Sequence, residues 1–219
     1  MGNHQQKEQN FLMALHSSSE DLGVAILDIC DPSKKISSKI FPLGKQLSTK
    51  LISCVEEIIP ASKWKQLVRI AVAIGPGGFT GTRLTVVMAR TLAQQINCSV
   101  DGISSFQLMA YRLSRQLSSE QLKKPFWIIK ELPRRGIVAG KYKIEKKSDF
   151  QDFENICELK LPYLINNNIE FSPSICAQEN VEEDVIRLLN ICKSRHESGT
   201  KSEWAEVLPI YPTSPVNNY

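Results

Sequence analysis

The apolar positions of the first 60 residues predict three strands followed by a helix. The expected strands cover residues 11–15, 22–29 and 35–42. A polar turn separates the first two, as in a hairpin, and in the third Ile36 and Ile40 fall on one face. From 46 to 59 the apolar positions recur every three or four residues, so an amphipathic helix is expected there and Pro60 ends it.

A buried strand, a glycine loop and a helix are expected to follow directly after one another. Residues 68–74 form a short apolar run, as in a strand covered on both faces. The loop 75–81 holds four glycines, which interrupt regular structure. A helix is expected over 83–96, with Thr80 or Thr82 as its cap. Its predicted apolar face consists of Leu84, Val87, Met88, Thr91, Leu92 and Gln95.

The remainder of the chain is expected to hold further strands and two more helices. The expected strands cover residues 97–103, 126–129, 136–144 and 159–165. Ser104 and Ser105 can cap a helix that extends to about residue 117, and acidic residues begin a second helix at about 181. Three prolines after residue 204 predict an extended C-terminal segment.

This order of elements predicts the fold class. An antiparallel meander followed by α/β alternation is the connectivity of the ribonuclease H-like fold, which actin-like ATPases share. We therefore expect an α/β protein with a mixed sheet, flanking helices and two lobes, the second a degenerate copy of the first. The expected division is a disordered segment at 1–10, a first lobe at 11–104, and a second lobe with an extended tail at 105–219.

Composition and charge narrow the range of partners. The chain has 219 residues and a net charge of +4, too mild for a nucleic-acid-binding surface, so direct tRNA contact is expected to be weak or absent. No apolar run is long enough to span a membrane, and the polar first residues do not form a signal peptide, so a cytoplasmic protein is expected. The six cysteines form no CxxC pair, which favours buried thiols.

The glycine loop matches neither of the common phosphate-binding motifs. Thr82 and Arg83 follow Gly81, so the Lys-Ser/Thr pair of a P-loop is absent. Thr80 also stands where a dinucleotide fingerprint would have its third glycine. On the glycines alone, a tight turn that lets the strand and the helix pack closely is the favoured interpretation.

As a whole, GPGGFTGTR closely resembles the signature of the TsaB (YeaZ) family, whose usual form is GPGSFTGxR. Gly78 stands where serine is usual, and the sequence of residues 75–95 resembles cyanobacterial members most. The signature residues are Gly75, Pro76, Gly77, Gly78, Phe79, Thr80, Gly81 and Arg83. The resemblance continues through residues 88–93 and 102–105 and returns at the closing segment Leu208-Pro209-Ile210-Tyr211.

The resemblance implies a fold and a function. The family has the actin-like fold and acts in making threonylcarbamoyladenosine, the modified base beside the anticodon of tRNA. Its members pair as a non-catalytic scaffold with the catalytic subunit TsaD, whose metal ligands they lack, and the ATPase TsaE joins them. The sequence itself has three histidines and no HxxxH or HExxH pair, so no metal site is expected. With no recognisable histidine context, a nucleophilic enzyme has little support.

The first hairpin departs from the actin-like pattern. Its turn aligns His16 with the carboxylate that holds magnesium in that fold, and a neutral imidazole is a poor magnesium ligand. His16, Ser17, Ser18 and Ser19 therefore resemble a degenerate phosphate loop, and the histidines are expected to be solvated. No cofactor is expected; ATP or ADP at the interface of the complex stays an open alternative that the sequence does not support. A nucleotide-binding ATPase or kinase-like protein is the first alternative function.

The helices at 46–59 and 83–96 are expected to face a TsaD-type partner, because they carry more apolar residues than one buried stripe needs. The candidate interface residues are Leu51, Val55, Leu84, Val87, Met88, Thr91 and Leu92. For each of them, packing in the protein's own core is the alternative. A second alternative function is a self-associating module that pairs these helices with another copy of the chain.

Overall fold

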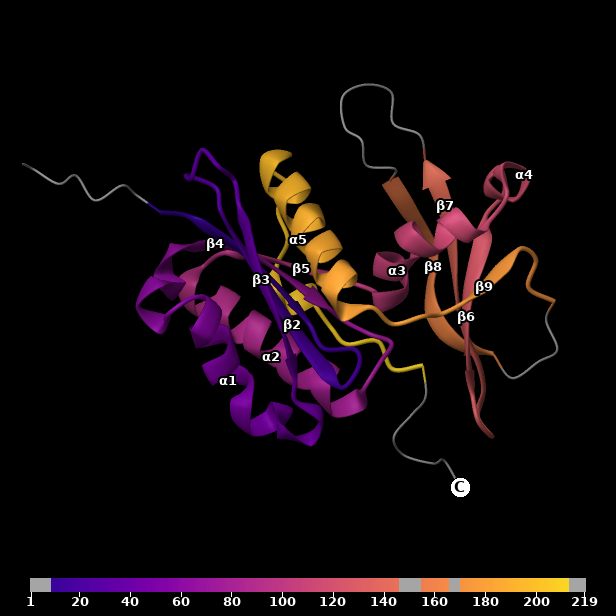
Figure 1. The fold of residues 1–219 in the computed structure, drawn as a ribbon, viewed down its shortest axis with the longest axis horizontal. Coiled ribbons are helices and arrows are strands. Elements are labelled where there is room, and N and C mark those ends of the chain that lie inside the picture. The colour runs from indigo at the N-terminus through magenta and orange to yellow at the C-terminus, as the bar shows by residue number, and fades with distance from the viewer. Residues whose placement is uncertain (1–8, 146–154, 166–169, 213–219) are drawn as a thin grey trace, which may run out of the picture.

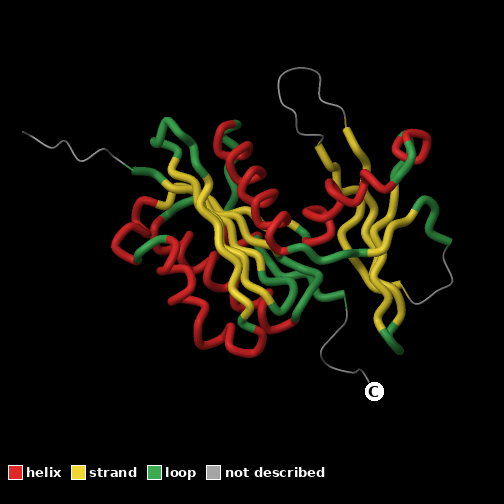
Figure 2. The backbone as a smooth tube through the Cα atoms, viewed as in Figure 1, coloured by secondary structure: helices red, strands yellow, loops and turns green. Residues whose placement is uncertain are grey.

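The computed structural model describes residues 9–145, 155–165 and 170–212 and contains two β-sheets (Figures 1 and 2). The first sheet has five strands in the order β3-β2-β1-β4-β5, and the second has four in the order β8-β7-β6-β9. The strands are β1 (Phe11–His16), β2 (Asp21–Asp28), β3 (Ile36–Pro42), β4 (Leu67–Ala73), β5 (Ser99–Ile103), β6 (Phe126–Leu132), β7 (Gly136–Glu145), β8 (Asn155–Ile165) and β9 (Ser174–Cys176). The helices are α1 (Leu47–Ile58), α2 (Phe79–Ile96), α3 (Ser105–Leu113), α4 (Ser119–Leu122) and α5 (Val181–Glu197).

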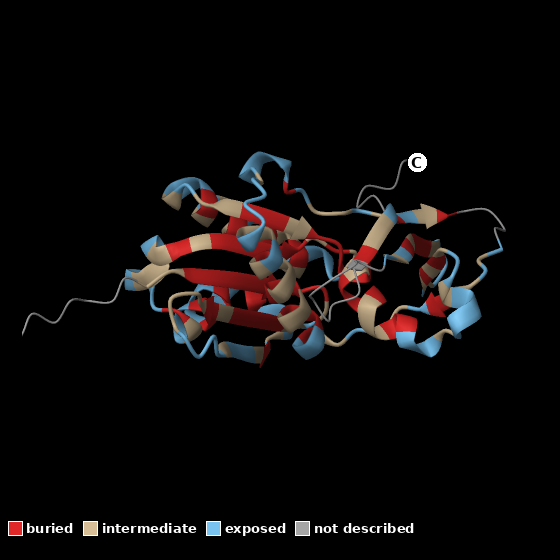
Figure 3. Cartoon of the chain, turned by 90° about the horizontal axis from the view of Figure 1, so that it is seen from above, coloured by how far each residue is buried: buried red, intermediate tan, exposed pale blue. Residues whose placement is uncertain are grey.

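The first sheet is an antiparallel meander extended by parallel strands. β1 pairs antiparallel with β2, β2 with β3, and the parallel strands β4 and β5 follow on the other side of β1. Alternate residues of β1 pack into two hydrophobic cores, one on each face of the sheet. Met13 and Leu15 pack on the side of α1 and α2, whereas Leu12 and Ala14 pack on the opposite side. Both faces of this sheet are therefore buried, and its strands are largely red in Figure 3.

Helix α5 covers the second face of the first sheet. Val185, Leu188, Leu189 and Cys192 pack there against side chains of β1, β2 and β4. This arrangement corrects the expected division of the chain, which placed everything after residue 104 in the second lobe. The apolar stripe of α5 is buried against the first sheet, so the first lobe is completed by residues from the end of the chain.

The second sheet repeats the strand order of the first on a smaller scale. β6, β7 and β8 form an antiparallel meander, and β9 lies parallel to β6 as β4 does to β1. Helix α3 packs against this sheet and buries Phe106 and Met109 with Phe126, Ile128 and Tyr142. The mixed sheets with flanking helices confirm the predicted actin-like, ribonuclease H-like fold, and the second sheet is its reduced copy.

The segment after α5 also returns to the first lobe. Val207 joins the core beneath α1 and α2, and the backbone N–H of Ile210 donates to the carbonyl of Ile74 at 2.8 Å. This contact places the closing segment of the chain beside the end of β4. The extended conformation that the prolines predict is interrupted by a single helical turn at Trp204–Glu206.

Asp101 joins three parts of the first lobe at one buried carboxylate. It accepts hydrogen bonds from Arg69 of β4 at 2.6 Å, from Arg195 near the end of α5 at 3.0 Å, and from Ser202 at 2.6 Å. Burial alone would raise the pKa of Asp101, but the hydrogen bonds from Arg69, Ser202 and Arg195 outweigh it and leave the pKa below its usual value. This carboxylate ties α5 and the closing segment to the sheet.

The predictions for the two ends of the chain and for the cysteines have mixed outcomes. Residues 1–8 of the predicted disordered segment and the last proline, Pro215, lie outside the described residues. Gln9 and Asn10 were predicted to be disordered but are hydrogen-bonded. The side-chain amide of Gln9 donates to Asp28 at the end of β2, and the carbonyl of Asn10 accepts from the backbone N–H of Ile29. Cys54 and Cys192 are buried as expected, whereas Cys176 is exposed. Within the described ranges, no helix has both the length and the apolar character needed to cross a bilayer.

Candidate functional site at the glycine loop

The glycine loop is shorter than its sequence indicates. Helix α2 begins at Phe79, so the residues from Phe79 to Gly81 form its first turn rather than the end of a loop. Its N-cap is Gly78, and no side chain accepts a hydrogen bond from the first turn, so neither Thr80 nor Thr82 caps the helix as predicted. Thr82 is instead buried one turn into the helix.

Gly77 has no side chain because another part of the backbone occupies that space. A Cβ atom on Gly77 would lie 2.2 Å from the carbonyl oxygen of Ser18, and the neighbouring Gly78 N–H donates to that same oxygen at 2.7 Å. A Cβ on Gly78 would meet nothing closer than 3.5 Å. The glycine loop is thus held against the turn between β1 and β2, with the closest approach at Gly77; a Cβ on Gly81 would also lie only 3.0 Å from the backbone oxygen of Ser17.

The serines of that turn are hydrogen-bonded within the protein. The Ser17 hydroxyl lies 2.9 Å from that of Thr85 on α2, and the Ser18 hydroxyl is bonded to that of Ser105 at the start of α3. The Ser19 hydroxyl accepts from the backbone N–H of Asp21 at 3.2 Å. The hydroxyls of the predicted phosphate loop therefore join β1 to α2 and α3.

His16 is buried, which corrects the expectation of a solvated side chain. It is 2% exposed, and neither ring nitrogen has a hydrogen-bond partner among the described residues. Burial, assisted by the positive charge of Arg112, lowers the pKa of His16 to about 4, so the ring is neutral at pH 7. Arg112 itself pairs with Asp184 of α5 at 3.0 Å. In the described parts of the chain, no group of three His, Cys, Asp or Glu side chains is placed to hold a metal ion.

Arg83 joins the signature segment to the closing segment of the chain. Its guanidinium carbon lies 3.4 Å from the ring centroid of Phe79 and 4.8 Å from that of Tyr211. Its Nε also donates to the Tyr211 hydroxyl at 2.8 Å. The sequence pointed to both segments separately, but only the structure shows that they form one contact at the start of α2.

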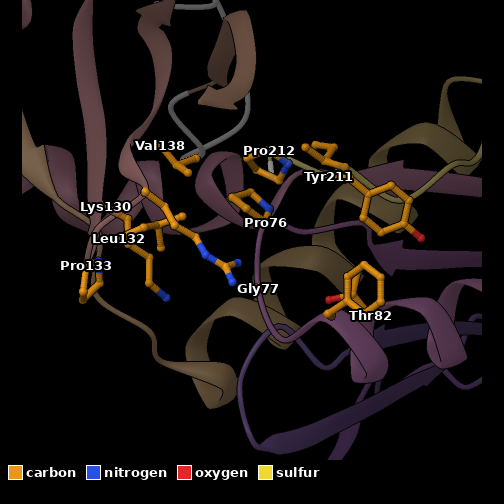
Figure 4. A pocket seen from close by; sticks show the side chains of 12 residues that line it. Pro76, Gly77, Thr82, Lys130, Leu132, Pro133, Val138, Tyr211 and Pro212 are labelled. Atoms are coloured by element: carbon orange, nitrogen blue, oxygen red, sulfur yellow. The ribbon is translucent and has the colours of Figure 1, made fainter. Parts of the chain in front are cut away.

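A cavity of about 560 Å³ lies beside this contact, between the two lobes (Figure 4). One wall comes from the glycine loop and the start of α2, another from the hairpin between β6 and β7, and a third from the closing segment. The lining residues are Pro76, Gly77, Phe79, Thr82, Lys130, Leu132, Pro133, Arg135, Val138, Ile210, Tyr211 and Pro212. The signature loop therefore belongs to a site that both lobes build.

The predicted partner surface is divided by the fold. Leu51 and Val55 of α1 are buried in the core and do not lie on the surface, which corrects that part of the prediction. Three of the predicted interface residues of α2, namely Leu84, Met88 and Leu92, are partly buried against this core. Val87, which is 58% exposed, and Thr91 do lie on the outer face of α2.

The face that α2 buries is lined by small residues, which the apolar periodicity did not select. Val86, Ala89 and Ala93 are at most 1% exposed. On α1, Ile52 is 59% exposed, although the same pattern counted it among the apolar positions of the helix. The outer surface of this helix pair therefore presents Ile52 and Val87.

Comparison with known proteins identifies relatives of one pathway. A family model described as TsaD, tRNA N6-adenosine threonylcarbamoyltransferase, matches residues 43–183. The TsaB proteins of Bacillus subtilis and of Buchnera aphidicola from Acyrthosiphon pisum are named as tRNA threonylcarbamoyladenosine biosynthesis proteins. The first is 30% identical over 101 residues, which are 45% of this chain and 43% of that protein. The second is 23% identical over 160 residues, covering 67% and 71% of the two chains.

Solved structures with the same fold come from Pseudomonas aeruginosa. A protein described as similar to peptidase YEAZ superposes with a TM-score of 0.66 at 16% identity, covering 93% of this chain and all of that one. A structure described as YeaZ gives a TM-score of 0.61 at 18% identity, with 92% and 99% covered. Since these identities are low, the superpositions establish the fold. The match to the Bacillus subtilis protein spans less than half of its length.

Proposed function

Since the chain belongs to the TsaD family and, within it, to the TsaB (YeaZ) group, we propose that it is a non-catalytic scaffold subunit. In this role it pairs with a TsaD-type catalytic subunit that transfers the threonylcarbamoyl group to the adenosine beside the anticodon of tRNA. The names of the relatives support the pathway, and the surface of the chain supports the role of a partner.

The observation that carries the proposal is the exposed apolar surface of the helix pair α1 and α2. These helices pack against each other, and each leaves one large aliphatic side chain exposed, Ile52 on α1 and Val87 on α2. Burying two such side chains against a partner contributes roughly 1.5–3 kcal/mol each. Neither side chain lines the cavity, so a partner could dock on this surface without contacting the glycine loop.

The turn between β1 and β2 favours a scaffold over an ATPase. Where the actin-like fold has its magnesium carboxylate, this chain has the neutral and buried His16. The hydroxyls of Ser17 and Ser18 are bonded to Thr85 and Ser105. A phosphate chain would have to break these contacts and would gain no carboxylate-held metal. We propose that the chain needs no nucleotide of its own for its role.

The remaining parts of the proposal concern location and partners. The complex works in the cytoplasm, and a TsaE-type ATPase joins it through TsaD or through this chain. Direct contact with tRNA is weak or absent, in keeping with a net charge of only +4. In the absence of TsaD the exposed helix pair can bind a second copy of itself, which would give a homodimer. Light scattering with and without TsaD distinguishes the two assemblies.

Charged substitutions on the helix pair test the interface. The double variant Val87→Arg and Thr91→Arg places two arginines on the outer face of α2, and co-purification with the TsaD-type subunit of the same organism should be lost. The control is Ser194→Arg, which adds one arginine at an exposed position of α5, on the opposite side of the first sheet, and the single variant Val87→Arg is compared with it directly. Pairing that survives the double variant, or is lost equally in the control, would exclude this surface.

Depletion of the protein tests the function itself. Bulk tRNA from depleted cells should contain less threonylcarbamoyladenosine, measured by mass spectrometry of nucleosides. Complementation with the unchanged chain should restore the modification, whereas the double variant should not. An unchanged level of the nucleoside after depletion would overturn the proposed function.

A further inference from the structure

We propose that the cavity between the two lobes is a binding site for a compact organic anion, a phosphate or carboxylate joined to an apolar body. Its volume of about 560 Å³ lies within the roughly 300–1,000 Å³ of typical small-molecule sites. It also lies where two lobes meet, which is a common position for such sites. This inference goes beyond the proposed function, because the pairing surface on α1 and α2 does not include it.

A polar wall of the cavity comes from the start of α2. Thr82 is 3% exposed and lines the cavity, and its hydroxyl has no hydrogen-bond partner among the described residues. Such an unpaired buried group is rare, because it loses its hydrogen bonds to water without replacement. Helix α2 also begins without a side-chain cap or an acidic residue in its first turn. Its positive end therefore has no negative group of its own nearby.

Positive charge faces this wall from the other lobe. Lys130 and Arg135 line the cavity from the end of β6 and the hairpin turn that follows it, and Figure 4 shows Lys130 across the cavity from Thr82. The Lys130 ammonium is partly compensated by Glu179 at 2.7 Å. Of the described residues that line the cavity, none is acidic. The cavity thus combines two cations, a hydroxyl and a helix N-terminus, a set that favours an anion.

The rest of the lining is apolar, so an inorganic ion alone would leave it unused. Phe79 and Tyr211 supply aromatic rings, and Leu132, Val138 and Ile210 supply aliphatic surface. Burial of an apolar body against these side chains adds to the affinity for the charged group. An aromatic monophosphate or carboxylate should therefore bind more tightly than inorganic phosphate.

Calorimetric titration of the full-length protein tests this site. Phenyl phosphate, benzoate and inorganic phosphate are the probes. At least one aromatic anion should bind at millimolar concentration or below, and more tightly than inorganic phosphate. Arg135→Gln should weaken that binding about tenfold, the loss expected for one charge-assisted hydrogen bond. Arg134→Gln is the matched control, because Arg134 is the neighbouring exposed arginine and does not line the cavity.

A second variant addresses the hydroxyl. Thr82→Val keeps the shape of the side chain and should weaken the aromatic probe several-fold, provided that thermal unfolding shows a folded protein. The proposal is overturned if neither aromatic anion binds, if Arg134→Gln weakens binding as much as Arg135→Gln, or if inorganic phosphate binds as tightly as the aromatic anions. Because no TsaD-type subunit is present, these results are independent of the pairing experiments.

Discussion

The two sheets share a strand order but differ in what surrounds them. In both, an antiparallel meander is extended by a strand parallel to its first member. The first sheet is covered on both faces, by α1 and α2 on one side and by α5 on the other. The second sheet packs against α3, and its first hairpin turn, at Arg134 and Arg135, is exposed.

This difference shows how the two halves divide their tasks. In the turn after β1, Ser17 and Ser18 are buried and bonded to α2 and α3, so this part of the turn serves stability. The corresponding turn after β6 carries two exposed arginines, one of which lines the cavity. The first lobe thus has its sheet covered on both faces, and part of that cover is α5 and the closing segment, which come from the second half of the chain.

Removal of α5 should have the largest effect on the stability of the first lobe. A chain that ends at Asn180 lacks Val185, Leu188 and Leu189, which are at most 1% exposed. At roughly 2 kcal/mol for each buried aliphatic side chain, their loss costs about 6 kcal/mol, comparable to the whole stability of a domain. The truncated chain should lose its near-ultraviolet circular dichroism and precipitate. A chain that ends at Pro212 keeps every described contact and should remain folded; a soluble, cooperatively unfolding chain 1–180 would contradict the shared-lobe arrangement.

Gly77→Ala should strongly destabilise the first lobe. The new Cβ would lie 2.2 Å from a backbone oxygen of Ser18, which cannot move aside as a flexible side chain could, so roughly 3 kcal/mol or more is expected. Gly78→Ser, which restores the usual family residue, places its Cβ at ordinary van der Waals spacing and should leave the urea midpoint almost unchanged. Arg134→Gln in the matching turn of the second sheet should change the free energy of unfolding by under about 0.5 kcal/mol.

His16 should make the first lobe sensitive to acid. Its pKa is about 4 in the folded protein against 6.5 for a solvated histidine, so the unfolded chain binds the extra proton between these values. Stability is therefore fully present above about pH 6.5 and falls by about 3 kcal/mol as the pH decreases to about 4. Other groups also titrate in this range, so the contribution of His16 is measured by comparing the pH dependence of stability in the unchanged protein and in a variant without this histidine.

His16→Leu provides that comparison. Leucine is the chosen replacement because the second sheet has Leu132 at the corresponding end of its first strand. Urea unfolding at pH 7.5 and at pH 4.5 should show a smaller loss of stability for the variant than for the unchanged protein. At pH 7.5 the variant should be at least as stable, since it removes two unpaired ring nitrogens. Equal pH dependence of the two proteins would mean that His16 is solvated in solution.

Loss of the hydrogen bond between Arg83 and Tyr211 should have the smallest effect on the free energy of unfolding. Tyr211→Phe removes the acceptor of the Arg83 Nε hydrogen bond but keeps the ring, so about 0.5–1 kcal/mol is expected for unfolding. Tyr163→Phe on β8 keeps its ring contact with Lys160 and serves as the control in the second lobe. A thermal unfolding midpoint that falls equally in both variants would show that the closing segment gains nothing from this contact.

Local patterns predicted most of the elements but not their long-range contacts. The strands at 11–16 and 67–73 and the helix at 47–58 lie within one or two residues of the predicted bounds, because period and flanking prolines are local signals. The contact of Gly77 with Ser18 is not local, and no pattern in either segment reveals it. The inward face of α2 was missed because Ala89 and Ala93 are weakly hydrophobic, although their small size is what lets the helix approach the sheet.

The dependence of the first sheet on α5 also bears on how the protein is made. A ribosome releases residues 11–103 well before residues 181–202, yet Asp101 needs both Arg195 and Ser202 to complete its hydrogen bonds. Until they arrive, one face of the sheet, including Leu12, Ala14 and Ala71, has no cover. Folding of the first lobe therefore cannot be completed until residues 181–202 have left the ribosome, and until then the uncovered strands are prone to aggregate.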